Sequence, residues 1–212
     1  MVAPLRTIEI RILGCLMEKA LATPEYYPLS VNALTNACNQ KSNRDPVVAY
    51  NESEVQATLD GLEEKGVVNQ SRVGRVPKYE ERLSQTHNLV PREIAALCVL
   101  MLRGPQTAGE IRARSGRLCA FENLEAVGET LGKLADWGLA ARLERLPGHK
   151  EARFAHLLGE EQVPHSGPEE DPSGIDALLG ERVTFLEAEL SVLQKDIAEL
   201  KAAFMAFKAQ FE

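Results

Sequence analysis

Turn signals and apolar stripes recur in one order along residues 5–158, and this repeat limits the folds open to the chain. LEEKGVV (62–68) matches LADWGLA (134–140) at an offset of 72 residues. Ser30, which can cap a helix, matches Thr107 at an offset of 77. A drift of this size is typical of loop insertions between duplicated units. Because the matches keep their order, the sequence favours an internal duplication.

The first repeat contains three helical segments followed by two extended ones. IEIRILGCLMEKAL places apolar residues on one face of a helix, and Ser30 can cap the next helix. Asn51 and Glu54 form a capping-box pattern that opens a third helix, and Gly66 stands where helices commonly stop. The residues on both sides of Gly74 then predict a short hairpin.

The second repeat has the same order of signals. Pro91 stands at a favourable early helix position, Thr107 can cap the next helix, and apolar residues from Leu124 to Leu134 line a third. LPGHK then separates the two strands of a second hairpin. Three helices followed by a hairpin is the winged-helix order, in which a helix-turn-helix precedes its wing.

The predicted fold is therefore mainly α with small β-hairpin wings. We expect two tandem winged-helix domains, 5–84 and 88–158, each with its own core. Leu59 and Leu131 should be buried, because they lie on the inner faces of the two third helices. A linker rich in Pro, Gly and acidic residues is expected over 159–174, since this composition favours disorder.

A heptad pattern predicts a C-terminal coiled-coil helix over 175–212. Its apolar residues recur in alternate steps of four and three, which is the spacing of a coiled-coil seam. A lone helix exposing this stripe needs a partner, so a homodimer is favoured over a helix folded back on its own domains. The expected seam positions are Leu179, Val183, Leu186, Leu190, Leu193, Ile197, Leu200, Phe204, Phe207 and Phe211.

The net charge of −7 is unevenly distributed along the chain. Residues 1–84 have a net charge of −1, residues 85–158 of +2, and residues 159–212 of −8. The folded part is thus near neutral, which permits nucleic-acid binding through a local patch without indicating it.

Several classes of protein are disfavoured. No apolar run approaches the ~20 residues that cross a bilayer, and no signal-peptide pattern opens the chain, so we expect a cytoplasmic protein without a membrane partner. The cysteines and histidines lack metal-ligand spacing, so no metal or cofactor is expected. No phosphate-loop, nucleophile-elbow or zinc-protease motif occurs, and the carboxylates are predicted on exposed helix faces. An enzyme is therefore not expected.

Four long blocks of sequence resemble the YceH-like family of uncharacterised bacterial proteins. The resemblance spans roughly 5–158 and implies two winged-helix domains and no catalytic residues. Blocks of this length are far more specific than a short motif. They are NALTNACNQKSNRDPV (32–47), ESEVQATLDGLEEKGVV (52–68), RVPKYEER (75–82) and VPREIAALCVLMLRGPQTAGEIRARSGRL (90–118).

Two functions stay open, a DNA-associated regulator and a protein-interaction scaffold in a chromosome or transcription complex. A winged helix normally places its third helix in the major groove of double-stranded DNA. Here both third helices are rich in Asp and Glu, which opposes binding to phosphates. The wings and loops would then have to hold DNA. Their candidate contacts are Lys41, Arg44, Arg72, Arg75, Lys78, Arg103, Arg112, Arg114 and Arg117. The scaffold reading rests on analogy at the level of the fold.

Overall fold

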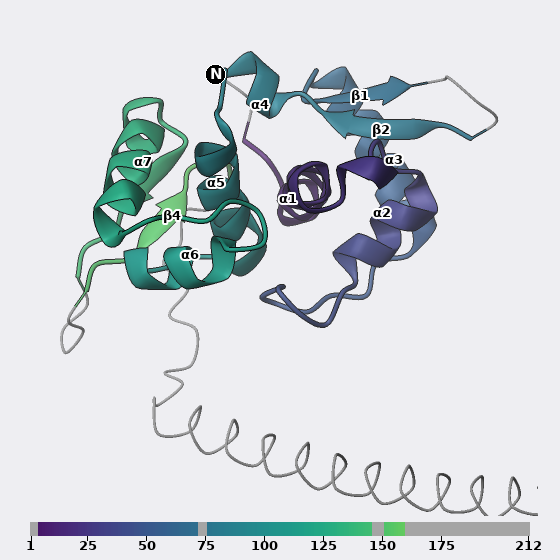
Figure 1. Ribbon diagram of the computed structural model, residues 1–212. Coiled ribbons are helices and arrows are strands. Elements are labelled where there is room, and N and C mark those ends of the chain that lie inside the picture. Colours follow the sequence, from purple (N-terminus) through teal and green to yellow (C-terminus); the bar gives the residue numbers. More distant parts are fainter. Residues whose placement is uncertain (1–3, 72–75, 146–150, 160–212) are drawn as a thin grey trace, which may run out of the picture. The chain divides into compact units, whose positions relative to one another are not determined.

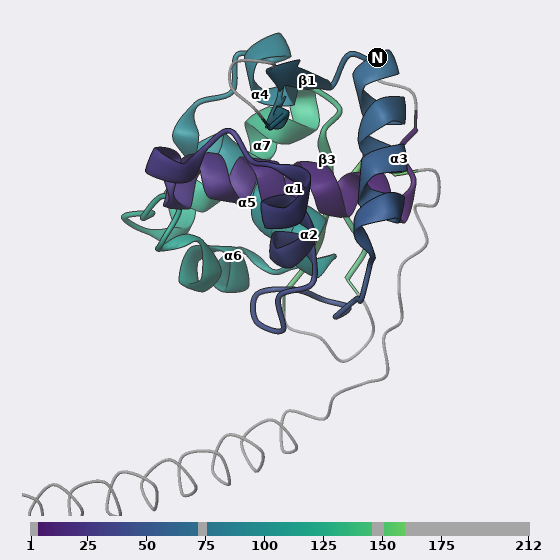
Figure 2. The same ribbon diagram turned by 90° about the vertical axis from the view of Figure 1, so that its right-hand side faces the viewer.

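The computed structural model describes residues 4–71, 76–145 and 151–159. The described part is mainly helical, with two antiparallel two-stranded hairpins (Figures 1 and 2). Its first half consists of α1 (Thr7–Ala22), η1 (Pro24–Tyr26), α2 (Val31–Cys38), α3 (Glu52–Glu64), β1 (Val68–Ser71) and β2 (Lys78–Glu81). Its second half consists of α4 (Leu83–Thr86), α5 (Pro91–Arg103), α6 (Ala108–Ser115), α7 (Leu124–Asp136), β3 (Ala140–Arg142) and β4 (Phe154–His156).

Some predicted features lie outside the described residues. These are the first wing tip with Arg72 and Arg75, the LPGHK turn, the linker from residue 160 onward, and the C-terminal helix with all ten seam positions. Gly159, expected to begin the linker, instead forms a parallel bridge with Leu5. The sequence analysis also did not predict the short helices η1 and α4.

The predicted helix starts are confirmed by their hydrogen bonds. The Ser30 hydroxyl accepts from the amide of Ala33 at 3.3 Å. The Asn51 side chain accepts from the Glu54 amide at 2.9 Å, and the Glu54 carboxylate accepts from the Asn51 amide at 2.8 Å. Thr107 forms the same reciprocal capping box with its third helical residue. These bonds satisfy amides that the helices leave without intrahelical partners.

Each third helix ends in the same way in both halves. Gly66 and Gly138 have φ values of 71° and 69°, a left-handed conformation that glycine adopts readily. The residue after each glycine then donates back into its helix, Val67 to Leu62 at 3.1 Å and Leu139 to Leu134 at 2.8 Å. The chain therefore turns into each hairpin at positions 72 residues apart.

Each hairpin is also attached to its half by a third backbone segment. In the first half, Leu29 and Tyr79 exchange two amide bonds of 3.1 and 2.7 Å. In the second half, Gln106 and Phe154 exchange two bonds of 2.9 and 2.7 Å. Because Leu29 and Gln106 each precede the cap of a second helix, the two halves repeat this connection as well as the order of their elements.

The expectation of two separate cores is wrong. The buried apolar side chains of both halves, including the fully buried Leu59 and Leu131, form one continuous cluster. Helix α1 lies in its middle and packs against α2 and α3 on one side and α5 on the other (Figure 1). Residues 9–18 of α1 and 95–102 of α5 are all buried. A segment that is apolar all round is buried on every side, and residues 12–17 of α1 and 95–102 of α5 are such segments.

The contact between α1 and α5 is close because Gly14 has no side chain. The Cys98 thiol lies 3.4 Å from the carbonyl oxygen of Gly14, to which it donates. A Cβ atom at position 14 would lie 2.8 Å from Leu102 Cδ2 and 3.0 Å from its Cγ. Leu102 is itself buried, so it has little room to move aside.

We predict that Gly14→Ala lowers the free energy of unfolding by about 1–3 kcal/mol, because the added methyl overpacks the α1–α5 contact. The matched control is Gly61→Ala in α3, where nothing lies within 4 Å of an added Cβ. It should raise the free energy of unfolding by about 0.5–1 kcal/mol through helix propensity. Urea denaturation followed by circular dichroism measures both. Equal effects of the two substitutions would contradict the close packing at Gly14.

His156 on β4 predicts a loss of stability in acid. Burial lowers the pKa of its imidazole from 6.5 to about 4, and its Nδ1 accepts from the Leu158 amide at 3.4 Å. The contribution of neutral His156 is fully present above pH ~6.5 and decreases as the pH falls toward ~4, because the unfolded chain takes up the proton first. The loss should reach about 3 kcal/mol at most. In urea titrations at several pH values, His156→Gln should flatten this dependence, and an unchanged slope would contradict the prediction.

Candidate functional site

The predicted DNA-contact residues occupy three kinds of environment. Lys41, Lys78 and Arg117 are exposed, as expected of surface contacts. Arg44 is buried. The remaining described candidates, Arg103, Arg112 and Arg114, form hydrogen bonds within the chain.

Arg44 is not available at the surface as the sequence analysis expected, because its side chain is 0% exposed. Its guanidinium donates to both carboxylate oxygens of Glu18 in α1, at 2.5 and 3.2 Å, and to the carbonyl oxygen of Ala37. Burial alone would lower the pKa of Arg44, but the hydrogen bonds to Glu18 raise it above its ordinary value. A buried pair of this kind holds the loop between α2 and α3 and leaves no cation on the surface.

Arg103 and Arg114 also have structural partners. Arg103, at the end of α5, donates to the Asn43 side chain in the loop between α2 and α3. Arg114 donates to the Gln106 side chain and lies 3.8 Å from the Glu110 carboxylate. Both arginines therefore connect elements of this chain, and a DNA phosphate would have to compete with these bonds.

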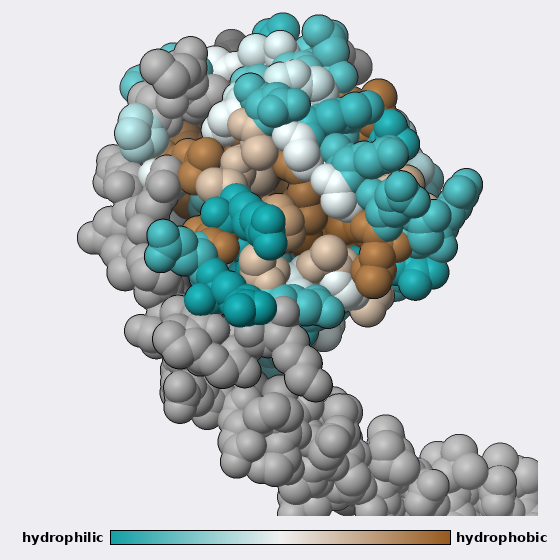
Figure 3. Space-filling view, turned by 90° about the vertical axis from the view of Figure 1, so that its left-hand side faces the viewer, coloured by the Kyte–Doolittle hydropathy of each residue, from teal (hydrophilic) through white to brown (hydrophobic). Residues whose placement is uncertain are grey.

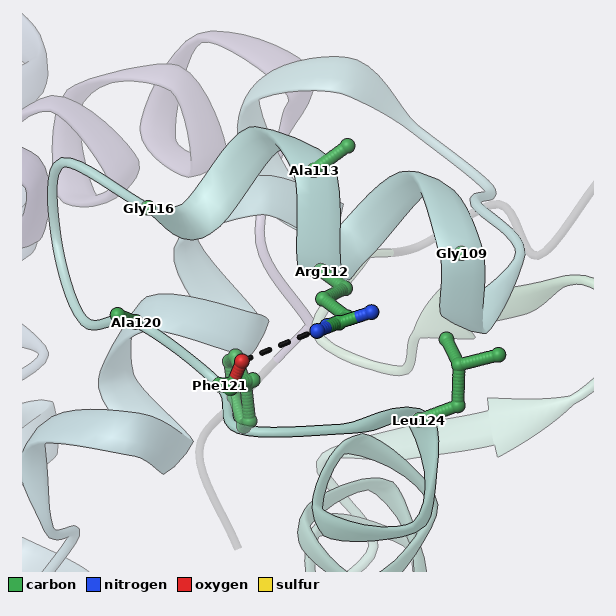
Figure 4. Close-up of a pocket in the computed structure, with 7 residues that line it drawn as sticks. All are labelled: Gly109, Arg112, Ala113, Gly116, Ala120, Phe121 and Leu124. Atoms are coloured by element: carbon green, nitrogen blue, oxygen red, sulfur yellow. Dashed lines mark hydrogen bonds between the residues drawn. The ribbon is translucent and has the colours of Figure 1, made fainter.

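Arg112 lies beside a shallow pocket between α6 and the start of α7 (Figure 4). Its guanidinium donates to the carbonyl oxygens of Phe121 at 3.4 Å and Glu122 at 2.8 Å. We call this pocket, of about 480 Å³, the α6–α7 groove. Its lining residues are Gly109, Arg112, Ala113, Gly116, Ala120, Phe121 and Leu124.

The α6–α7 groove is lined mostly by small and apolar residues. Leu124, at the start of α7, is 50% exposed. Figure 3 shows the side of the molecule on which α7 lies in Figure 1, and there apolar residues gather between hydrophilic ones. The groove is thus a shallow pocket with a mostly apolar lining beside the Arg112 side chain.

The exposed faces of the two third helices are acidic. Their exposed carboxylates, with that of Glu122 two residues before α7, belong to Glu52, Glu54, Asp60, Glu63, Glu64, Glu122, Glu125, Glu129 and Asp136. Lys65 follows α3 but does not offset this charge, because its ammonium bonds both oxygens of Glu9 at 2.9 Å. Burial alone would raise the pKa of Glu9, but hydrogen bonds from Lys65 and Arg6 lower it, so Glu9 is a charged partner.

The sequence analysis missed the buried charges of α1. Glu9, Arg11 and Glu18 are buried, although the carboxylates were expected on exposed faces. Arg11 donates to the carbonyl oxygens of Cys38 at 3.4 Å and Pro46 at 2.5 Å. Arg11 and Glu18 share a helix face with Cys15, at spacings of four and three residues. That spacing around a buried cysteine was the available signal.

Two features are absent from the described residues. No group of three or more His, Cys, Asp or Glu side chains there is placed to hold a metal ion. None of the helices in the described ranges is both long and apolar enough to span a membrane.

Comparisons with known proteins place the chain among bacterial relatives. The family model "Protein of unknown function, DUF480" matches residues 5–149. A UPF0502 protein of Geobacter sulfurreducens is 49% identical, with 98% of each chain covered. A UPF0502 protein of Solibacter usitatus is 46% identical, with 96% of each covered. These alignments extend beyond residue 158, so the similarity also includes the C-terminal segment.

Among solved structures, ScpB from Mycobacterium tuberculosis is similar to this chain at 19% identity and a TM-score of 0.26. That similarity covers 73% of this chain and 93% of ScpB, and at this score it carries no conclusion. The family match agrees with the YceH-like resemblance. The chain belongs to the DUF480 family of uncharacterised bacterial proteins, whose members include the UPF0502 proteins.

Proposed function

We propose that this chain is a non-enzymatic interaction protein whose two winged-helix repeats, 5–84 and 88–158, share one core and bind a protein partner rather than reading duplex DNA. The observation that carries the proposal is the acidity of the exposed faces of α3 and α7. These are the helices that would enter the major groove in a DNA-binding winged helix.

Several of the described basic side chains are bonded to acceptors within the chain. A DNA-binding protein gains most of its affinity from Lys and Arg at phosphates, and carboxylates close to the same phosphates oppose it. Arg44 is buried against Glu18, and Lys65 is bonded to Glu9. Arg103, Arg112 and Arg114 are bonded to acceptors in this chain. Other cations, such as Lys41, Lys78 and Arg117, are exposed outside α3 and α7. Within these two helices Lys133 is the one basic residue, against eight exposed carboxylates.

DNA association remains the second candidate because of the first wing. Lys78 is exposed at the start of β2, and Arg72 and Arg75 stand six and three residues before it in the sequence. Three cations on one wing could contact the phosphate backbone without any base readout. Such binding would be weak and would depend strongly on salt.

Titration with a mixed-sequence duplex tests the two candidates. We expect a Kd weaker than about 10 µM at about 200 mM salt, with tighter binding only near 50 mM salt. Arg75→Glu with Lys78→Glu should remove the low-salt binding, whereas Glu63→Gln with Glu64→Gln should strengthen it. Fluorescence anisotropy of labelled DNA measures each. Submicromolar binding at the higher salt that is lost when exposed α3 residues such as Ser53 and Ala57 are changed would refute the proposal.

We also propose that residues 175–212 join two copies of the chain through the predicted heptad seam. Light scattering on the full chain should give the mass of a dimer. Leu193→Asp places a charge in the seam and should give a monomer. Ser191→Asp introduces the same residue two positions earlier, off the seam, and should leave the dimer intact. A native chain that is monomeric at tens of micromolar would contradict self-association.

A further inference from the structure

The two halves of the fold carry different side chains at the α6–α7 groove and at its equivalent in the first half. The caps Ser30 and Thr107 align α2 with α6 at an offset of 77 residues. The caps Asn51 and Asn123 align α3 with α7 at an offset of 72. Residues of the second half can thus be compared with their structural equivalents in the first half.

In the first half, polar side chains close the equivalent surface. Asn32 stands at the position of Gly109, and Glu52 at the position of Leu124. The Asn32 amide donates to the Glu52 carboxylate at 2.6 Å and so joins α2 to the start of α3. Asn36, at the position of Ala113, donates to the Asn32 side chain at 3.3 Å.

In the second half, the equivalent surface is an open apolar hollow. Gly109 and Ala113 replace the asparagines, and Leu124 replaces the carboxylate. Figure 4 shows the side chains of Ala113 and Leu124 on opposite sides of the pocket, with Arg112 drawn toward Phe121. The same backbone thus has a closed, hydrogen-bonded surface in one half and an open groove in the other.

Several helical glycines have no packing reason in the described part of the chain, and of these Gly109 lines the groove. A Cβ added at Gly128 or Gly132 on α7 would have nothing within 4 Å, and one at Gly109 only the Thr107 hydroxyl at 3.8 Å. A glycine inside a helix destabilises it relative to alanine. At Gly109, which lines the groove, the missing side chain leaves room for the close approach of another backbone.

We propose that the α6–α7 groove binds an amphipathic helix of a protein partner, with small apolar side chains in the groove and basic side chains beside α7. The inference rests on the proposed function and adds the chemistry of the partner. The charge follows from Glu125 and Glu129, which are exposed and have no ion-pair partner among the described residues. These two carboxylates outnumber the exposed Lys133 one turn further along α7. An apolar groove with charges along one side is typical of helix-in-groove recognition.

The test uses the full chain and a phage library of random peptides about 16 residues long, a little over four helical turns. Selected peptides should be amphipathic and basic. The double variant Gly109→Asn with Leu124→Glu introduces into the second half the side chains that are hydrogen-bonded as Asn32 and Glu52 in the first half. It should weaken binding of a labelled selected peptide by about tenfold or more. Asn36→Ala, on the equivalent face of α2, is the matched control and should change the Kd by less than about twofold.

Two further variants keep the test decisive. Ala113→Gln obstructs the groove at a single exposed position without adding charge, and should weaken binding even where the double variant fails to fold. Glu125→Gln with Glu129→Gln should weaken binding about threefold or more at low salt and reduce its salt dependence. Circular dichroism verifies that each variant is folded.

Failure of this inference and failure of the proposed function give different results. Selection of no peptide, or of peptides whose binding survives both groove variants, overturns the groove assignment. A dimer mass that changes in the groove variants shows a second copy in the groove and overturns it as well. The proposed function instead fails on tight, salt-resistant duplex binding in the DNA titration.

Discussion

The packing of α1 against α5 is the contact on which the rest of the structure depends. It is close because Gly14 has no side chain where Leu102 and Cys98 approach. Since α1 also packs on α2 and α3, one helix connects the interiors of both halves. The two repeats therefore share one core, and a change at their contact should be felt in both.

Buried charges strengthen this central contact and change the surface. Glu18 of α1 holds Arg44, and the adjacent Asp45 amide donates to the Leu102 carbonyl of α5 at 2.9 Å. The loop between α2 and α3 is thus attached to both halves. Because a buried ion pair needs both partners, Arg44 serves the fold and not the surface. Burial of basic side chains leaves the exposed carboxylates of α3 and α7 to set the local charge.

Duplication gives a comparison within one molecule. Both halves keep the capped second helix, the glycine after the third helix and the bonded hairpin, since these form the fold. They differ where Asn32 and Glu52 correspond to Gly109 and Leu124. A difference that the fold does not require is where a particular function can reside, and the α6–α7 groove is such a difference.

The sequence by itself determined the helix starts at Ser30, Asn51 and Thr107, the stop at Gly66 and both hairpins, because caps and turns depend on residues a few positions apart. Only the tertiary structure decided that the core is shared, that Arg44 is buried and that a groove opens beside Leu124. Arg44 meets Glu18 across 26 residues, and Cys98 meets Gly14 across 84. A periodic pattern shows which face of a helix is apolar, but only the assembled fold decides what that face meets.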